Sequence, residues 1–345
     1  MKMKTILVDG NWNLKRNFKR SIILDAYGNN CGGTLGFVKS LRTAINRVLP
    51  DRIVVAWDGH RSGILRHSIY PPYKANRNKD WDNEERIYSG DFKSFEDKEK
   101  YDFLIQKINT QNILEELFVR QMEVDLIEAD DLIAGYVQLS EWEQRDEHIV
   151  LFSRDKDFKQ FISDRVSVMT PDSVTMITPK NFKEKNGYIL ENELLVRCFE
   201  GDVSDSIEGV KGITVNQLSK YFPDFCDRKY TYQDLFNRAM YMINEEKNKS
   251  KTLQKIVDSK NVLYRNAQLM NLKKPFLNDQ ALEEIRRVTH LPMDDDRSIK
   301  RLIQTFMLDG YIDLIKQDGI DIGSFFSPFY RIMSKELDFK KSLKK

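Results

Sequence analysis

Cysteine and histidine are scarce in this chain of 345 residues. The three cysteines, Cys31, Cys198 and Cys226, lie far apart, which argues against a disulfide framework and favours a reducing compartment. None of the four histidines pairs with a cysteine or another histidine at the spacing of zinc ligands. The sequence therefore predicts neither a disulfide-stabilised fold nor a zinc site.

Long apolar runs are also missing. The longest, residues 53–57 and 149–152, have the length of a strand and are too short to cross a membrane. The apolar run near the N-terminus is interrupted by Asp9, so it lacks the core of a signal peptide. We expect a cytoplasmic protein without membrane contact.

Neither sign of charge is in excess, because 55 lysines and arginines face 53 acidic residues and the net charge is +2. A nucleic-acid-binding protein needs its basic residues on one face rather than a high net charge. The balance therefore leaves that class of protein open. The length allows one large domain or two ordinary ones.

Three β-branched runs are present and predict buried strands at residues 5–8, 53–57 and 149–152. Apolar residues between the first two recur at helical spacing and predict an amphipathic helix. These residues are Leu35, Val38, Leu41, Ile45 and Val48. Strands that alternate with helices form parallel βαβ units, which bind ligands beyond the carboxyl ends of the strands. The predicted fold class is α/β with a parallel sheet.

An aspartate follows each predicted strand: Asp9, Asp58 and, two residues further on, Asp155. Aspartate is common in turns, so one such residue would carry no functional meaning. Three aspartates at the same edge of one sheet favour a functional site.

Further acidic residues lie at the starts or ends of predicted helices. They are Glu128, Asp130, Asp131, Asp157, Asp202 and Asp205. Helix capping explains one or two acids per helix, but Glu128, Asp130 and Asp131 lie so close that they repel each other. Bound cations relieve such repulsion, and ligand sets made only of oxygen select Mg²⁺ or Mn²⁺. The acidic run at 294–296 stands alone before a helix, and we assign it to capping.

Basic residues and aromatic rings alternate in residues 61–79. The residues of interest are Arg61, Arg66, Tyr73, Lys74 and Arg77. Basic side chains contact phosphates, and rings stack on unpaired bases. A solvated loop is the alternative, but the segment directly follows Asp58, so we expect it beside the carboxylates.

A glycine-containing turn is predicted between two helices in residues 191–221. The turn carries Gly209, Lys211 and Gly212, and Thr214 can cap the second helix. Glycine lets the backbone approach a phosphate closely, and amides at a helix N-terminus bind anions. This pattern is typical of proteins that bind the DNA backbone without sequence specificity, although a plain helical hairpin also uses glycine.

Strand signals end near residue 190, so we place an α/β core at residues 1–188 and an all-helical region at 189–345. Residues 166–177 predict a β-hairpin, and residues 78–100 lack apolar periodicity and predict an insertion. Helical periodicity is also present at residues 102–117, 235–243 and 253–272. We assign the aromatic pair Phe325 and Phe326 to core packing.

Five motifs carry a resemblance to a known family. They are VDGN at 8–11, AWDGHRSGILRHSIYPPYKANR at 56–77, EADDLI at 128–133, SRDKDFKQFI at 153–162 and GDVSDSIEGVKGI at 201–213. Together, in this order, they resemble the 5′-nucleases: flap endonucleases, the 5′→3′ exonuclease domain of bacterial DNA polymerase I, and phage 5′-nucleases also called RNase H. The length of the chain resembles that of the phage type.

The resemblance implies a PIN-like core and a structure-specific 5′→3′ exonuclease or flap endonuclease. Its substrates would be branched or 5′-ended DNA and RNA–DNA hybrids, as in the removal of RNA primers. It also implies two Mg²⁺ ions, for which Mn²⁺ substitutes. The implied ligands are Asp9, Asp58, Glu128 and Asp130 for one ion, and Asp155, Asp157, Asp202 and Asp205 for the other, with Asp131 between the two groups.

Other expectations also follow from the resemblance. Lys74 and Arg77 would act at the scissile phosphate, together with the ligands Asp58 and Asp155. Residues 78–105 would form a helical arch around a single-stranded 5′ end. Residues 191–221 would be a helix–three-turn–helix that grips duplex DNA and holds K⁺ in some relatives. The expected protein partners are a single-strand-binding protein or a sliding clamp, and the expected state is a monomer in a bacterial or phage-infected cell.

The chain departs from the family pattern at several positions. Trp57 stands where phenylalanine is usual, and Ser206 and Glu208 replace asparagine and proline. Residues 214–216 replace a Gly-Pro-Lys run, which removes a lysine from the predicted duplex contact. Three alternatives stay open from the sequence: a PIN-like ribonuclease, a non-catalytic binder of DNA structures, and a metal-dependent phosphatase.

Overall fold

The computed structural model describes residues 2–20, 22–75, 89–91, 93–171, 175–294 and 296–343. Arg77 and the part of the predicted arch at 78–88 lie outside these ranges. Within them, no helix combines the length and the apolar character that crossing a membrane requires.

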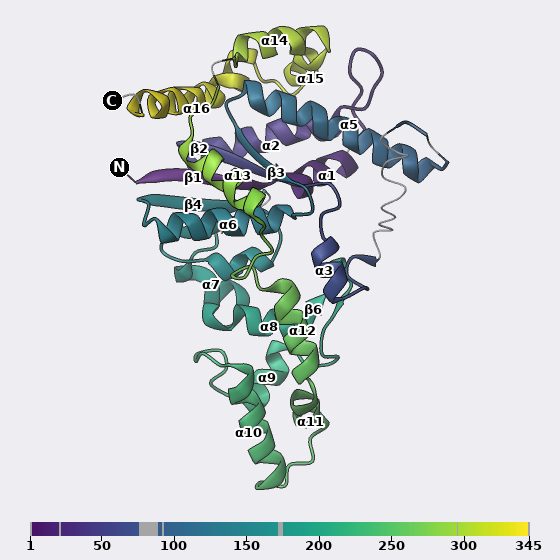
Figure 1. The fold of residues 1–345 in the computed structure, drawn as a ribbon, viewed down its shortest axis with the longest axis vertical. Coiled ribbons are helices and arrows are strands. Elements are labelled where there is room, and N and C mark those ends of the chain that lie inside the picture. Colours follow the sequence, from purple (N-terminus) through teal and green to yellow (C-terminus); the bar gives the residue numbers. More distant parts are fainter. Residues whose placement is uncertain are drawn as a thin grey trace.

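A five-stranded parallel sheet lies at the centre of the fold (Figure 1), with strand order β3-β2-β1-β4-β5. The strands are β1 (Met3–Asp9), β2 (Arg52–Asp58), β3 (Arg120–Val124), β4 (Glu147–Phe152) and β5 (Val166–Met169). The three predicted strands are confirmed as β1, β2 and β4. The chain adds β2 and β3 on one side of β1 and then crosses to β4 on the other. The β1–β4 junction is therefore the reversal point, where open α/β sheets bind ligands.

Helices cover both faces of the sheet. Side chains alternate along β1, so that Leu7 packs on one face while Ile6 and Val8 pack on the other. The face of Ile6 lies under α1 (Gly10–Arg20), α2 (Gly32–Val48) and α5 (Phe95–Glu116), and the face of Leu7 under α6 (Ala129–Trp142) and α7 (Pro179–Asn186). The predicted amphipathic helix is confirmed as α2. Helix α5 begins seven residues before its predicted start, because the Ser94 side chain accepts a hydrogen bond from Asp97 and caps it.

A group of helices tapers away from the sheet (Figure 1), and we call residues 193–270 the distal lobe. Its helices are α8 (Glu193–Glu200), α9 (Val215–Tyr221), α10 (Tyr232–Asn244), α11 (Lys251–Asp258) and α12 (Lys260–Met270). Two strands of two residues, β6 (Gly201–Asp202) and β7 (Ile207–Glu208), pair between α8 and α9. The prediction of an entirely helical region was wrong here, since strands this short leave no periodicity. The pattern at 253–272 is likewise two helices, separated by Ser259.

The last helices return to the sheet. Helix α13 (Asp279–His290) packs on β3 and α6, while α14 (Ile299–Leu308) packs on α5 and α16 (Ile322–Ser342) packs on α2 and β2. Between α14 and α16 lies α15 (Tyr311–Gln317). Phe325 and Phe326 are fully buried, which confirms their assignment to the core. Residues 189–345 thus divide between the distal lobe and helices that complete the core.

Asp294 and Asp296, the described residues of the acidic run, do not cap α14. The cap is Ser298, whose hydroxyl accepts a hydrogen bond from the Arg301 N–H, and Asp296 instead forms an ion pair with Arg301 at 3.1 Å. The capping assignment was therefore wrong. Serine one residue before the helix supplies the acceptor that the earlier acids are too far away to supply.

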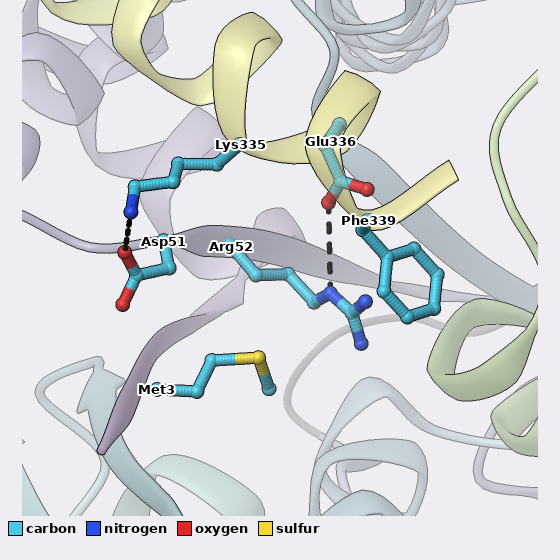
Figure 2. Close-up of a pocket in the computed structure, with 6 residues that line it drawn as sticks. All are labelled: Met3, Asp51, Arg52, Lys335, Glu336 and Phe339. Carbon is cyan, nitrogen blue, oxygen red and sulfur yellow. Dashed lines mark ion pairs between the residues drawn. The ribbon is translucent and has the colours of Figure 1, made fainter. Parts of the chain in front are cut away.

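A buried ion-pair cluster lies at the amino edge of the sheet, where Arg52 begins β2 and Arg120 begins β3. Arg120 forms two hydrogen bonds with the Glu336 carboxylate, at 2.9 and 2.5 Å, and Arg52 Nε lies 3.5 Å from the same carboxylate. Both guanidinium groups stand over the ring of Phe339, at 4.7 and 5.3 Å from its centroid. Figure 2 shows Arg52, Glu336 and Phe339 lining a pocket. The cluster fastens α16 to the sheet.

Candidate active site

The predicted aspartates lie at the carboxyl edge of the sheet. Asp9 ends β1, Asp58 ends β2, and Asp155 follows β4 by three residues. Glycine after Asp58 is required by close packing, because a Cβ on Gly59 would lie 1.8 Å from the carbonyl oxygen of Val124. The end of β2 therefore lies tight against the end of β3, which fixes the position of Asp58.

Side chains at this edge form a connected network. Ser153 Oγ donates a hydrogen bond to Asp9 (3.2 Å) and accepts one from the Asp155 N–H (3.0 Å). Asn11 Nδ2 donates to Asp58 (3.0 Å), whose other carboxylate oxygen accepts from the N–H of Ala129 at the start of α6 (2.9 Å). The network places carboxylates from three strands and the start of α6 side by side.

Glu128 and Asp131, at the start of α6, share one arginine. Arg66 Nη1 donates to both carboxylates at 2.6 Å, and Arg66 Nη2 donates to Asp131 at 2.9 Å. The guanidinium is 5% exposed, and its Nε donates to the carbonyl oxygen of Leu269. The sequence suggested Arg66 as a nucleic-acid contact and Asp131 as a metal ligand. In the structure both residues belong to a buried ion pair, so we assign to them the role of holding Glu128 in position.

Lys74 carries a buried ammonium group at the same place. It pairs with Glu128, and its Nζ lies 3.9 Å from Asp205 Oδ2. Burial lowers the pKa of Lys74, but the attraction of Glu128 together with that of Tyr73, Asp205 and Asp58 outweighs this effect, so the pKa lies well above its usual value. The Tyr73 hydroxyl donates to Glu128 at 3.1 Å, and its ring is 6% exposed. Tyr73 is therefore placed to orient Glu128 and not to stack on a base.

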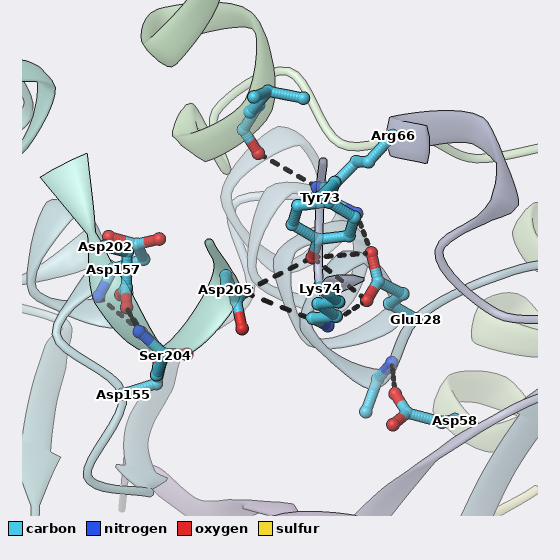
Figure 3. A network of polar contacts seen from close by, with 12 residues as sticks. Asp58, Arg66, Tyr73, Lys74, Glu128, Asp155, Asp157, Asp202, Ser204 and Asp205 are labelled. Carbon is cyan, nitrogen blue, oxygen red and sulfur yellow. Dashed lines mark hydrogen bonds and ion pairs between the residues drawn. The ribbon is translucent and has the colours of Figure 1, made fainter. Parts of the chain in front are cut away.

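A second group of carboxylates surrounds Arg197, which the sequence analysis missed. Arg197 is buried in α8 and donates to Asp157 at 2.8 Å and to Asp202 at 2.7 Å. Asp155 accepts a hydrogen bond from the Asp157 N–H at 2.7 Å. Figure 3 shows Asp205 between this group and the Lys74–Glu128 pair. Arg197 lies five residues before Asp202 in the sequence, and this spacing is the signal that could have identified it.

Burial and, to a smaller extent, mutual repulsion shift the pKa values of these acids. Burial raises the pKa of Asp9 to about 7, with a contribution from Asp58 and Asp155. Burial and the nearby Asp155 likewise raise the pKa of Asp157 to about 7, and that of Asp130 rises well above its usual value. Carboxylates in this situation gain most from a bound cation, which removes the repulsion.

The side chains do not form a ready coordination shell. Among the residues that the structure describes, no group of three or more acidic, histidine or cysteine side chains is arranged to hold a metal ion. Lys74, Arg66 and Arg197 occupy oxygens of four of the acids, Glu128, Asp131, Asp157 and Asp202. The donor chemistry nevertheless suits a hard cation, because every candidate ligand is a carboxylate.

The predicted glycine turn lies between β7 and α9. Thr214 caps α9 and accepts a hydrogen bond from the Gln217 N–H at 3.4 Å. Gly212 has a φ of +85°, a conformation that side chains rarely adopt. Gly209 packs so tightly that a Cβ would lie 2.3 Å from the Glu200 carbonyl oxygen. Lys211 is exposed on this turn, on the distal lobe rather than among the carboxylates.

Arg61 is half-buried in the turn after β2, close to the site in sequence. Asn11 and Ser153 belong to the motifs that carry the resemblance, but sequence reasoning gave them no role. Both are polar residues two positions from a predicted ligand, which is the signal that could have identified them.

A parallel sheet that gathers aspartates and a buried lysine at its carboxyl edge is typical of metal-dependent enzymes of phosphoryl transfer. Residues 4–187 match the sequence model of the 5′-3′ exonuclease N-terminal, resolvase-like domain. This match covers more than half of the chain, so the chain belongs to the 5′-3′ exonuclease family of nucleases. The predicted family and the parallel-sheet nuclease fold are thereby confirmed.

Relatives and solved structures agree with this assignment. A 5′-3′ exonuclease of Buchnera aphidicola subsp. Schizaphis graminum is 25% identical over 68% of this chain and 75% of its own length. The thermostable DNA polymerase I of Thermus filiformis is 30% identical over 61% of this chain, which spans only 22% of that polymerase. A bacteriophage T5 flap endonuclease, solved as a pseudo-enzyme-product complex with DNA and metal ions, has the same fold. Its TM-score is 0.58 at 18% identity, over 96% of this chain and 99% of that one.

Proposed function

We propose that this chain is a structure-specific 5′→3′ exonuclease and flap endonuclease that hydrolyses phosphodiester bonds near the 5′ ends of branched DNA. The observation that carries the proposal is the pair of carboxylate groups on either side of Asp205, beside the buried ammonium of Lys74. The names of the Buchnera exonuclease and the T5 flap endonuclease support it.

Two Mg²⁺ ions, with Mn²⁺ as a substitute, fit the donor set because all the candidate ligands are carboxylates with mutual repulsion. Asp9, Asp58, Glu128 and Asp130 would hold one ion, and Asp155, Asp157, Asp202 and Asp205 the other. When bound, such ions polarise the scissile phosphate and acidify the attacking water. The T5 structure, which contains metal ions, supports this chemistry.

The chain's own side chains contribute in three ways. Lys74 holds a positive charge where negative charge develops on the phosphate, which stabilises the transition state. Arg66 holds Glu128 in place, and Arg197 holds Asp157 and Asp202 in place. Arg77, three residues after Lys74 in the sequence, is proposed as a second phosphate contact.

Further parts of the proposal concern substrates and partners. RNA–DNA hybrids would be cleaved as well, consistent with a role in removing RNA primers. The turn at Gly209 and Gly212 would bind duplex backbone and could hold K⁺. A single-strand-binding protein or a sliding clamp would be the protein partner of a cytoplasmic monomer.

The decisive test is cleavage of two labelled substrates, a 5′-flap DNA and an RNA–DNA hybrid, with Mg²⁺ and with chelator. We expect short 5′ products from both substrates in Mg²⁺ and none with chelator. Cleavage that persists in chelator would contradict the metal chemistry. Cleavage of the flap alone would restrict the enzyme to DNA, and cleavage of neither would refute the proposal.

A further inference from the structure

A strongly basic surface lies at the far end of the distal lobe, away from the carboxylates. Residues 247–260 contain five lysines and a single acidic residue, Asp258. We define the lysine face as the exposed lysines Lys211, Lys247, Lys249, Lys251 and Lys255. They lie on the glycine turn, on the connection from α10 to α11, and on α11 (Figure 1).

The lysine face forms no ion pair in the part of the chain that the structure describes, where none of its five lysines lies within 4.0 Å of a carboxylate. Among the neighbouring acids, Glu246 pairs with Arg238 at 3.5 Å and Asp258 accepts a hydrogen bond from Gln254 at 2.9 Å, while Glu245 is exposed before the first lysine. Uncompensated charges of one sign repel each other and attract a polyanion.

Lys255 joins α11 to the glycine turn. Its ammonium donates a hydrogen bond to the carbonyl oxygen of Lys211 at 2.9 Å. A Cβ on Gly212 would lie 3.4 Å from Lys255 Nζ, so glycine at this position leaves room for the ammonium. An ammonium has three donors, and this contact uses one. The side chain is exposed, so the other two donors can reach a phosphate.

The spacing of the lysines suits a nucleic-acid backbone. Lys251 and Lys255 are one helical turn apart on the same side of α11, about 6 Å along its axis. Successive phosphates of one DNA strand advance by about 3.4 Å along the duplex, so phosphates two steps apart are separated by about 6.8 Å along the axis. Beyond Lys251, a pocket of 380 Å³ is lined by Lys247, Lys249 and Ser250 at the tip of the lobe.

We propose that the lysine face binds the phosphate backbone of duplex DNA, so that the duplex contact runs from the glycine turn along α11 to the tip of the distal lobe. This inference rests on the proposed function for the identity of the substrate. It assigns Lys255 and Lys251 as phosphate contacts, which act on affinity and not on the chemical step.

The test compares binding of a 5′-flap DNA by the full chain and by Lys255→Gln, using fluorescence anisotropy in Ca²⁺ at several salt concentrations. We expect the variant to bind several-fold more weakly at low salt. Its slope of log affinity against log salt should be smaller by about 0.9, the value for one phosphate contact. The double variant Lys251→Gln/Lys255→Gln should lose about twice as much slope.

Lys300→Gln is the matched control, because Lys300 is an exposed lysine on α14, at the opposite end of the molecule. It should leave the affinity and the slope unchanged. Trimming the duplex from the end distant from the flap should abolish the difference between the wild type and Lys255→Gln. Equal affinity and slope for Lys255→Gln and Lys300→Gln would overturn the inference and leave an acidic protein segment as the ligand to test.

The two proposals fail in different ways. If the wild type does not cleave the flap but its binding depends on Lys255, the result supports DNA binding by the lysine face and contradicts the proposed nuclease activity. If the wild type cleaves and Lys255→Gln binds normally, only the lysine face falls. Lys300→Gln, which lies outside both the carboxylate site and the lysine face, should cleave at the wild-type rate.

Discussion

The backbone N–H of Lys74 donates a hydrogen bond to the carbonyl oxygen of Asp205, and the two atoms are 2.8 Å apart. Lys74 has a φ of +54°, a conformation that costs a residue other than glycine about 1–3 kcal/mol. The bond to Asp205 helps to hold this conformation. It ties the basic segment after β2 to the residue that lies between the two carboxylate groups.

Replacing Lys74 with alanine should slow single-turnover cleavage by about 100-fold or more at saturating enzyme, because it removes a fixed charge aimed at the reacting phosphate. Substrate affinity in Ca²⁺ should change much less. Lys74→Arg, which keeps the charge, should recover part of the rate. A defect confined to affinity, absent at saturating enzyme, would make Lys74 a phosphate anchor only.

Asp155→Asn should abolish cleavage and leave binding of a 5′-flap DNA in Ca²⁺ largely intact. The substitution also removes a charge that repels Asp9 and Asp130. The melting temperature in metal-free buffer should therefore stay the same or rise. Cleavage and gel-shift affinity measure the first effect, and a thermal melt measures the second. Normal cleavage by the variant would remove Asp155 from the site.

Arg66→Met should lower the free energy of unfolding by about 3–5 kcal/mol, because it leaves Asp131 buried without its counter-charge and Glu128 with Lys74 alone. Urea denaturation measures this change. Arg61→Met, at a half-buried arginine of the same segment, is the comparison and should cost much less. If Arg66→Met kept full stability and only weakened DNA binding, the assignment of Arg66 to nucleic-acid contact would be restored.

Glu336→Gln should destabilise the protein by about 3–5 kcal/mol, since Arg52 and Arg120 would stay buried with no carboxylate between them. Lys335→Gln is the control in the adjacent position, because Lys335 forms only a partly exposed pair with Asp51 (Figure 2), worth about 0–1 kcal/mol. Thermal melts of both variants test the difference. Equal melting temperatures would show that the cluster at the amino edge contributes little.

Runs of apolar residues predicted those strands whose own side chains are apolar and buried. β1, β2 and β4 are runs of apolar residues, and each was predicted. β3 was missed because Arg120, Gln121 and Glu123 interrupt it. Arg120 is buried only because Glu336 lies opposite, and Gln121 accepts a hydrogen bond from Trp57 Nε1 at 2.9 Å. Such partners are distant in sequence, so no local sequence pattern predicts them.

The residues of the candidate site likewise include some that the sequence predicted and some that it did not. The acids could be predicted because strand ends and helix starts bring them to one edge. The arginines that hold them could not, since Arg66 reaches Asp131 across 65 residues and Arg197 reaches Asp157 across 40. Composition alone cannot distinguish an arginine that pairs with a buried carboxylate from one that is available to bind a phosphate.

The helices that return to the sheet have a consequence for any shortened form of this protein. Residues 299–332 contribute ten buried apolar side chains to the same cluster as Val8 and Trp57. The family match ends at residue 187, long before them. A fragment cut at that point would keep most of the acidic residues but expose to water the apolar surfaces of α2, α5 and β2 that α14 and α16 cover. We therefore expect it to aggregate when expressed alone. Truncations made to isolate the catalytic centre should keep α14–α16 as well as the segment that carries Arg197, Asp202 and Asp205.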